Sequence, residues 1–201
     1  MYPSRFAATL TAVILSVAPW AATAQNQSEG YKFLEAVRGE KITEVEEALN
    51  KPGSVVINAK DVAKGDTALH IVVDTGNAQY LGYLLGRGAA PNVRNNAGIA
   101  PIVMAANKGR ADLVALFVRY KANVNYGNSN GETALIAATR RRDLQLIRTL
   151  LDAGANPDQP DLLAGMSARD YAAQDTRSPA VARELADAPK QQKRAVAGPK
   201  F

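Results

Sequence analysis

The stretch Gly131-Glu-Thr-Ala-Leu-Ile-Ala-Ala-Thr139 returns, with changes, at three other places in this chain of 201 residues. The related stretches are Gly65-Asp-Thr-Ala-Leu-His-Ile-Val-Val73, Gly98-Ile-Ala-Pro-Ile-Val-Met-Ala-Ala106 and Gly165-Met-Ser-Ala-Arg-Asp-Tyr-Ala-Ala173. Their first glycines lie 33, 33 and 34 residues apart. Self-similarity at a fixed period of this length is typical of proteins that stack one structural unit on the next.

A second motif keeps the same spacing downstream of the first. It reads Leu84-Leu-Gly-Arg-Gly-Ala-Ala-Pro-Asn92, Phe117-Val-Arg-Tyr-Lys-Ala-Asn-Val-Asn125 and Leu150-Leu-Asp-Ala-Gly-Ala-Asn-Pro-Asp158. With this period, the chain resembles the ankyrin-repeat family, whose repeats carry Thr-Pro-Leu-His early and Gly-Ala-Asp-x-Asn late. The resemblance covers roughly residues 30–187. It implies an all-α solenoid of three full repeats, at about 65–97, 98–130 and 131–164, between two irregular capping repeats.

The residue types agree with a first helix at each quoted stretch. Thr67, Thr133 and Ser167 stand where that helix starts, and their hydroxyls are good acceptors for its free amides. Pro101 suits a first helical turn in the repeat where Ala100 replaces the capping residue. Small apolar residues follow and let neighbouring helices approach closely: Val72, Ala105, Ala106, Ala137 and Ala138.

A second helix follows in each repeat, with apolar residues at spacings of three and four. Its stripe consists of Leu81, Leu84, Leu85, Leu113, Leu116, Phe117, Leu146, Ile147, Leu150 and Leu151. Gly88 and Gly154 stand where this helix ends in a left-handed residue. Lys121 takes that place in the repeat 98–130, and we expect a strain of about 1 kcal/mol there. The turn-rich segments 58–64, 92–97 and 125–130 predict loops or β-hairpin fingers.

The two ends depart from the repeat pattern. Residues 31–50 predict two helices, at 32–38 and 41–50, with a polar outer side as an N-terminal cap needs. Residues 178–187 predict a closing helix. Residues 189–201 are basic and flanked by proline, and we expect a disordered tail. The ankyrin-repeat domain is therefore predicted to span residues 25–188.

Residues 1–24 have the three parts of a secretory signal peptide. A short start with Arg5 precedes an apolar run at 6–17, and Ala22-Thr-Ala24 supplies the small residues of a cleavage site. The apolar run is shorter than the roughly 20 residues that cross a bilayer, which favours cleavage over the alternative of an uncleaved anchor. We therefore predict a Sec-type signal cleaved after Ala24, a periplasmic product with an extracellular one as the alternative, and no stable membrane insertion afterwards.

The composition leaves little room for site chemistry. The chain has no cysteine and one histidine, His70, so disulfides, thiolate metal sites and cysteine nucleophiles are excluded. The family resemblance implies a structural role for His70, with hydrogen bonds to its own and the adjoining repeat. No glycine-rich phosphate loop and no acid–base pair of carboxylates stands out. We expect no enzymatic activity, no metal and no cofactor.

The resemblance implies that partners contact the fingers and the exposed ends of the first helices, along the concave side. The corresponding positions here are Lys64, Asp66, Asp74, Thr75, Asn96, Ile99, Asn107, Lys108, Asn130, Glu132, Arg140 and Arg141. We add Tyr126 as an aromatic anchor at a finger tip. Charge along these positions changes from acidic near Asp74 to basic at Arg140 and Arg141, which predicts an elongated protein partner with an acidic segment. The run of arginines at 140–142 also has a plain structural explanation, since cations stabilise a helix C-terminus.

These observations predict a monomeric, non-catalytic protein-binding module. The formal net charge of +5 is modest, and the basic residues are not interleaved with exposed aromatic residues, which argues against nucleic acid. Two alternatives stay open. One is a secreted effector that binds host or competitor proteins, and the other is a structural envelope protein whose basic tail holds anionic polymers. That tail contains Lys190, Lys193, Arg194 and Lys200.

Overall fold

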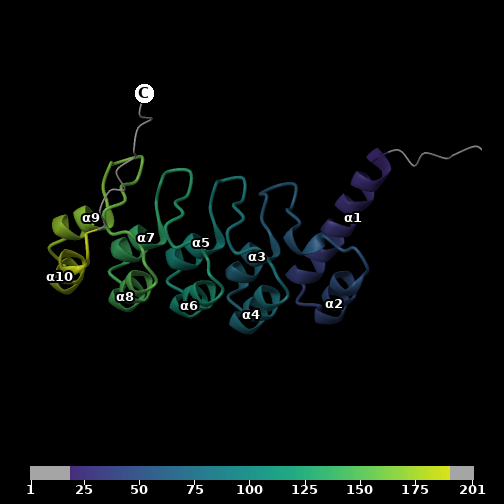
Figure 1. The fold of residues 1–201 in the computed structure, drawn as a ribbon, viewed down its shortest axis with the longest axis horizontal. Coiled ribbons are helices and arrows are strands. Elements are labelled where there is room, and N and C mark those ends of the chain that lie inside the picture. The colour runs from purple at the N-terminus through teal and green to yellow at the C-terminus, as the bar shows by residue number, and fades with distance from the viewer. Residues whose placement is uncertain (1–18, 191–201) are drawn as a thin grey trace, which may run out of the picture.

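Helices in pairs account for the regular structure of residues 19–190, the part of the chain that the computed structural model describes. The ten α-helices of this part are α1 (Pro19–Arg38), α2 (Ile42–Asn50), α3 (Ala68–Thr75), α4 (Ala78–Gly86), α5 (Pro101–Asn107), α6 (Ala111–Arg119), α7 (Ala134–Arg141), α8 (Leu144–Asp152), α9 (Ala168–Gln174) and α10 (Pro179–Asp187). A short 3-10 helix, η1 (Val56–Asn58), follows α2. The pairs stand side by side in one row, and the loops between them project on one side as fingers (Figure 1).

The first helices start where the sequence predicts. The Thr133 hydroxyl accepts a hydrogen bond from the amide of Ile136 at 3.2 Å, and Ser167 caps α9 through Asp170 in the same way. Pro101 is the first residue of α5, where its missing N–H group leaves no helical bond unmade. These N-caps confirm the predicted phase of the repeat.

The core is a continuous row of small and large apolar side chains. Ala105, Ala106, Ala137 and Ala138 are at most 1% exposed, so the first helices pack closely against one another, as predicted. The second helices fill the remaining space with fully buried leucine, isoleucine and phenylalanine: Leu81, Leu84, Leu113, Phe117, Leu146, Ile147 and Leu150. Burying each of these large side chains stabilises the stack by roughly 1.5–3 kcal/mol.

The fingers are not β-hairpins, and that prediction was wrong. Within residues 19–190 the fingers contain no strand, only an isolated bridge between Gly127 and Thr133. At the tip of each finger, one side-chain oxygen accepts hydrogen bonds from at least two backbone N–H groups. The four accepting residues are Asp61, Asn95, Asn128 and Asp161. Backbone groups of some tips also bond to the neighbouring finger, since Leu162 N donates to Asn130 O at 2.7 Å. These bonds satisfy the backbone in place of a hairpin ladder.

A ladder of asparagines fixes the distance between successive fingers. In each step a side-chain oxygen accepts from a backbone N–H 31 or 32 residues later, at 2.7–2.8 Å. The pairs are Asn58 with Ala90, Asn92 with Asn123, and Asn125 with Asn156. The fingers are therefore held in register with the helices beneath them.

The N-terminal end differs from the prediction in the length of its first helix. Helix α1 starts at Pro19, 13 residues before the predicted start at residue 32, and passes through the predicted cleavage position after Ala24. Proline is well tolerated in a first turn, and the alanine-rich residues that follow favour a helix. The greater part of the predicted signal, residues 1–18, lies outside the described residues. None of the helices in the described part of the chain is long and apolar enough to cross a bilayer.

The closing helix α10 agrees with the prediction for residues 178–187, and Ser178 is its N-cap residue. Of the predicted basic tail, only Pro189 and Lys190 belong to the described residues, and residues 191–201 lie outside them.

Lys121 has a left-handed backbone, with φ of 61°, as the sequence predicts. We expect Lys121→Gly to raise the free energy of unfolding by about 0.5–1 kcal/mol, because glycine adopts this conformation without a Cβ penalty. Gly154→Ala is the matched control. Gly154 has φ of 85°, and an added Cβ would meet no heavy atom within 4 Å, so this change introduces strain without a clash. Urea unfolding should show a higher free energy of unfolding for Lys121→Gly and a lower one for Gly154→Ala. A lower free energy of unfolding for Lys121→Gly would contradict the expected backbone strain at Lys121.

Candidate functional site

The predicted contact residues lie on one surface, which is formed by the fingers and by the first helices α3, α5, α7 and α9. We call this surface the groove face. Most of the predicted side chains are exposed there, whereas Asp66, Ile99 and Glu132 are half-buried. The opposite sides of the same helices are fully buried in the stack, which holds the exposed side chains on a rigid support.

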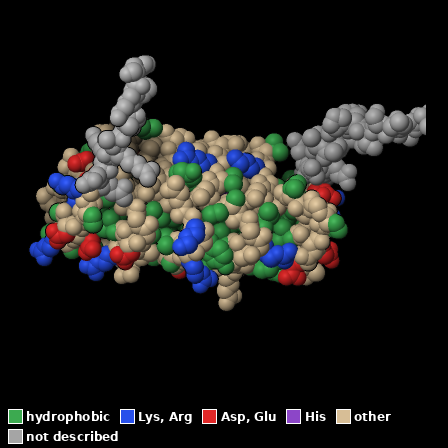
Figure 2. Space-filling view, viewed as in Figure 1, with side chains coloured by type: hydrophobic (Ala, Val, Ile, Leu, Met, Phe, Trp, Pro, Cys, Tyr) green, Lys and Arg blue, Asp and Glu red, His purple; other side chains and the backbone are tan. Residues whose placement is uncertain are grey.

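Several predicted residues on the groove face contact one another. Lys108 Nζ lies 2.8 Å from Asp74 Oδ1, and Arg140 Nη1 lies 3.1 Å from Glu132 Oε1. These ion pairs moderate the predicted change from acidic to basic along the face. On the side of the molecule drawn in Figure 2, Lys and Arg side chains likewise occur together with Asp and Glu side chains. Exposed pairs of this kind contribute less than about 1 kcal/mol, so a partner can replace them at low cost.

Arg141 is placed differently from Arg140. It donates from Nη1 to the backbone oxygen of Asn107 at 3.1 Å and so crosses from α7 to the end of α5. Within residues 19–190 no carboxylate forms an ion pair with Arg141. The cationic charge predicted near the end of α7 is therefore only partly neutralised.

Tyr126 does not lie at a finger tip, which corrects that part of the prediction. The turn at the tip is closed by Gly131 N donating to Asn128 O at 2.9 Å, so Tyr126 lies two residues before it. The guanidinium of Arg94 sits 4.8 Å from the centre of the Tyr126 ring. Tyr126 is 36% exposed, and the contact with Arg94 leaves less of its ring for a partner than a free tip would.

Three hollows open along the groove face. The N-terminal hollow has a volume of about 530 Å³ and is lined by Arg38, Asp61, Ala63, Lys64, Asp66, His70, Ile71, Asp74, Thr75 and Met104. Two smaller hollows adjoin each other at the other end, with volumes of about 360 and 230 Å³. The larger is lined by Thr139, Arg140, Tyr171, Gln174, Asp175, Thr176 and Arg177, and the smaller by Asn130, Glu132, Arg140, Asp161, Leu163 and Tyr171. We call this pair of hollows the C-terminal cleft.

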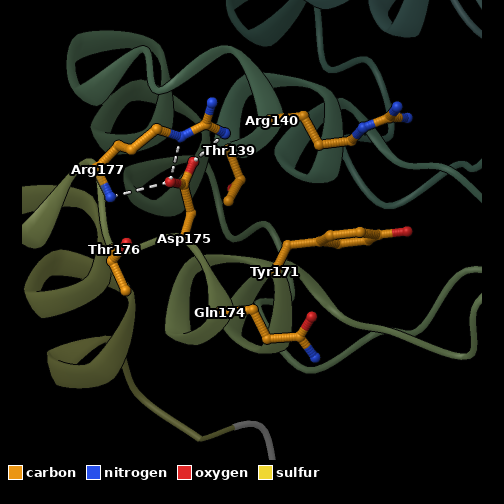
Figure 3. A pocket seen from close by; sticks show the side chains of 7 residues that line it. All are labelled: Thr139, Arg140, Tyr171, Gln174, Asp175, Thr176 and Arg177. Atoms are coloured by element: carbon orange, nitrogen blue, oxygen red, sulfur yellow. Dashed lines mark hydrogen bonds and ion pairs between the residues drawn. The ribbon is translucent and has the colours of Figure 1, made fainter.

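Arg140 and Tyr171 line both halves of the C-terminal cleft. Figure 3 shows their side chains extending in the same direction, from α7 and from α9, away from the paired Asp175 and Arg177. The sequence prediction included Arg140 but missed Tyr171, Leu163 and Gln174. Tyr171 and Gln174 belong to the last, irregular repeat, for which the family pattern offered no contact positions, and Leu163 lies in the finger that leads into it.

The carboxylates of the C-terminal cleft have donors of their own. Arg177 and Arg142 both donate to Asp175, at 2.9 and 2.6 Å, and hold the pKa of that carboxyl well below its ordinary value. The Tyr171 hydroxyl donates to Asp161 at 2.5 Å, which lowers the pKa of Asp161 and raises the pKa of Tyr171. Both aspartates are therefore anionic and already engaged at neutral pH.

His70 has a structural position. It is fully buried, its Nδ1 accepts the amide of Thr67 at 3.1 Å, and its Nε2 lies 2.9 Å from the backbone oxygen of Ile99 in the next repeat. The bond from Thr67 identifies Nδ1 as the acceptor, so Nε2 carries the proton and donates to Ile99. Among the described residues no group of three or more histidine, aspartate or glutamate side chains could hold a metal ion.

Residues 69–161 match the sequence model of Ankyrin repeats, in three copies. This segment consists of ankyrin repeats. Among curated proteins, a putative ankyrin repeat-containing protein of Treponema pallidum is 36% identical over 111 residues, which cover 55% of this chain and 37% of that protein. The B-cell lymphoma 3 protein homolog of Mus musculus is 36% identical over 105 residues, covering 52% of this chain and 23% of that protein.

A third relative, the human transient receptor potential cation channel subfamily A member 1, is 29% identical over 126 residues, covering 62% of this chain and 11% of that protein. The chain thus spans well under half the length of these relatives. Ankyrin repeats are protein-interaction modules, and their stacking creates extended binding surfaces. The three matched repeats contribute the central part of the groove face.

Proposed function

We propose that this chain is a non-catalytic protein-binding module whose partner docks on the groove face. One observation carries the proposal. The N-terminal hollow and the C-terminal cleft open on the same face, and both are lined by exposed polar side chains on helices whose other sides are fully buried. A rigid support with variable side chains on one face is how stacked repeats bind other proteins.

The partner is proposed to carry an acidic segment that meets the end of α7. Arg141 has no ion-pair partner in the described part of the chain, and Arg140 is 60% exposed with a single bond to Glu132. A guanidinium has five N–H donors and binds carboxylates in a directional, bidentate way. These two arginines therefore offer a carboxylate-bearing segment more donors than they use within the chain.

The place of action is proposed to be the periplasm or the cell envelope. The support for this is the signal-like sequence at residues 1–24. Mass measurement of the protein recovered from producing cells tests it, because a cleaved product starts at Gln25 and an uncleaved one keeps the earlier residues.

We propose that the module acts as a monomer and without a cofactor.

The binding surface can be tested by site-specific photo-crosslinking in the full chain. A crosslinking amino acid at Asn107, which is exposed at the end of α5 on the groove face, is expected to trap a partner protein in the producing cells. The matched control is the same amino acid at Gln145, which is also exposed, on the second helix α8. A discrete crosslinked band at Asn107 and none at Gln145, read by gel shift and mass spectrometry, is the expected result.

Two outcomes would count against the proposal. A partner trapped from Gln145 but not from Asn107 would move the binding surface to the second helices. The absence of any crosslinked protein from either position, with retention of envelope polymer instead, would favour a structural envelope protein.

A further inference from the structure

The C-terminal cleft has an apolar edge formed by two adjacent large side chains, whereas the first finger tip carries a single one, Val62. Leu162 and Leu163, at the tip of the last finger, are 76% and 77% exposed, and Leu163 lines the cleft beside Arg140. The tips of the two preceding fingers carry Asn96 and Ser129 at the corresponding positions. Large apolar side chains that stay exposed on a soluble surface mark a contact site when they gather next to a cleft.

The two leucines are displayed by a well-fixed turn. Asp161 is 6% exposed, and one of its side-chain oxygens accepts the backbone N–H groups of residues 163, 164 and 165 at 2.7–3.1 Å. Its other oxygen accepts the Tyr171 hydroxyl, which ties the finger tip to α9. The leucines therefore stay exposed without being free to fold back, and a partner meets them in a fixed position.

The hydrogen-bonding capacity left for a partner in this cleft lies largely on a cationic side chain, Arg140. Asp161 and Asp175 are engaged by the donors described above, and Glu132 is 17% exposed and paired with Arg140. Arg140 uses one N–H group for that bond, and the described residues offer it no other hydrogen-bond acceptor. The Arg140 guanidinium and the Tyr171 ring extend toward the same side of the cleft (Figure 3).

The polar groups opposite Arg140 complete the cleft. The Gln174 amide and the Thr176 hydroxyl are exposed and make no side-chain hydrogen bond to any residue between 19 and 190. They provide donors and acceptors for the backbone of a bound segment. The two hollows, of about 360 and 230 Å³, lie at or below the lower end of ligand pockets and so fit single side chains better than a compact small molecule.

We infer that the C-terminal cleft is the anchoring site of the partner, and that it takes an extended peptide segment with a bulky apolar side chain next to a carboxylate. The apolar side chain packs against Leu163 and the Tyr171 ring, and the carboxylate binds Arg140. Tyrosine and arginine are the residue types that most often carry the binding energy of an interface. This inference rests on the proposed protein-binding function and narrows it to one end of the groove face.

The test is selection of short segments from a display library of random peptides of roughly eight residues, which span about 27 Å when extended. The full chain serves as bait. Selected peptides are expected to share an adjacent apolar and acidic pair. The best of them, as a labelled synthetic peptide, is expected to bind Arg140→Gln and Leu163→Ser at least about tenfold more weakly, by fluorescence polarisation.

Matched variants separate the cleft from general effects of charge and hydrophobicity. Arg119→Gln removes an exposed arginine on α6, and Val62→Ser removes an exposed apolar side chain at the first finger tip. Both are expected to bind the peptide within about twofold of the unchanged chain. Circular dichroism of all four variants should show unchanged helix content, because each altered side chain is exposed.

Other outcomes would overturn the inference. Selected peptides without a carboxylate, or binding that Arg140→Gln and Leu163→Ser leave unchanged, would remove the cleft from the anchoring role. Loss of binding in Lys64→Ala and Asp66→Ala variants instead would assign the peptide to the N-terminal hollow. Selection of no peptide would also overturn it, while crosslinking at Asn107 would still decide the proposed function by itself.

Discussion

Replacing His70 with alanine is expected to lower the free energy of unfolding by about 3 kcal/mol. The change removes the acceptor for the Thr67 amide and the donor to the Ile99 oxygen, and it leaves a cavity at a fully buried position. Each buried hydrogen bond contributes about 1 kcal/mol, and a cavity adds to the loss. Urea unfolding of the full chain, followed by circular dichroism, measures the effect.

His70 also makes the stability of the fold sensitive to pH below about 6.5. Burial disfavours the charged imidazolium and lowers the pKa of His70 from its ordinary value of 6.5, although the bond to Ile99 partly offsets this. The unfolded chain therefore binds a proton at a higher pH than the folded chain. The stability that His70 contributes is complete above about pH 6.5 and is lost as the pH falls from there through the lowered pKa.

The variant His70→Val is the control for the loss of stability in His70→Ala and for the pH dependence. Valine and isoleucine occupy the corresponding position in the next two repeats, as Val103 and Ile136, so an apolar side chain suits this part of the stack. We expect a smaller loss than for His70→Ala, and no loss of stability between pH 6.5 and 5 beyond that of the remaining groups. An unchanged pH dependence in His70→Val would show that another group titrates there.

The helical framework could be predicted because its signals are local and repeated. Thr133 and Ser167 cap helices through bonds that span three residues, and glycines or proline fix the neighbouring positions. The fingers could not be predicted in the same way. Their backbone is satisfied by tip side chains such as Asp161 and by neighbouring fingers, and no local pattern of alternating residues distinguishes that arrangement from a hairpin.

The ion pair between Asp74 and Lys108 could have been predicted from the sequence. Asp74 and Lys108 lie 34 residues apart, close to one period, and so occupy similar places on adjacent repeats. A period that stacks repeats also stacks their surface charges, and opposite charges at matching positions will pair. The prediction followed the charges along the groove face but did not pair Asp74 with Lys108, and so overestimated the charge left for a partner.

The residues on the C-terminal side of the cleft were missed for a different reason. The family pattern gave contact positions only for regular repeats, and Arg169 and Asp170 mark the last one as irregular. The sequence nevertheless contained an indication of this surface. Asp161 lies one period after Asn128, and it is followed by two leucines, whereas Asn128 is followed by two polar residues. Two adjacent large apolar residues, in a loop whose two preceding equivalents carry Asn96 and Ser129, indicate a contact site.

Arg169→Ala is expected to loosen the last repeat while leaving the others intact. Arg169 is 18% exposed, pairs with Asp158 at 2.7 Å, and donates to the backbone oxygens of Leu185, Ala186 and Ala188 at the end of α10. Bonds from a charged donor to helix-end carbonyls contribute about 1.5–3 kcal/mol. We expect a local loss of about 3 kcal/mol, which converts to roughly a 100-fold faster amide exchange in α10.

Hydrogen exchange resolves this change along the chain because repeats contact only their neighbours. Amides of α10 should lose protection in Arg169→Ala, while those of α5, two repeats away, keep it. The control is Arg148→Ala, which removes an arginine that also bonds to α10, at 2.8 Å from Glu184, but is 53% exposed. Such a surface pair should change exchange by about twofold or less. Equal loss of protection in α5 and α10 of Arg169→Ala would instead show that the stack unfolds as one unit, and the last repeat could then not loosen on its own.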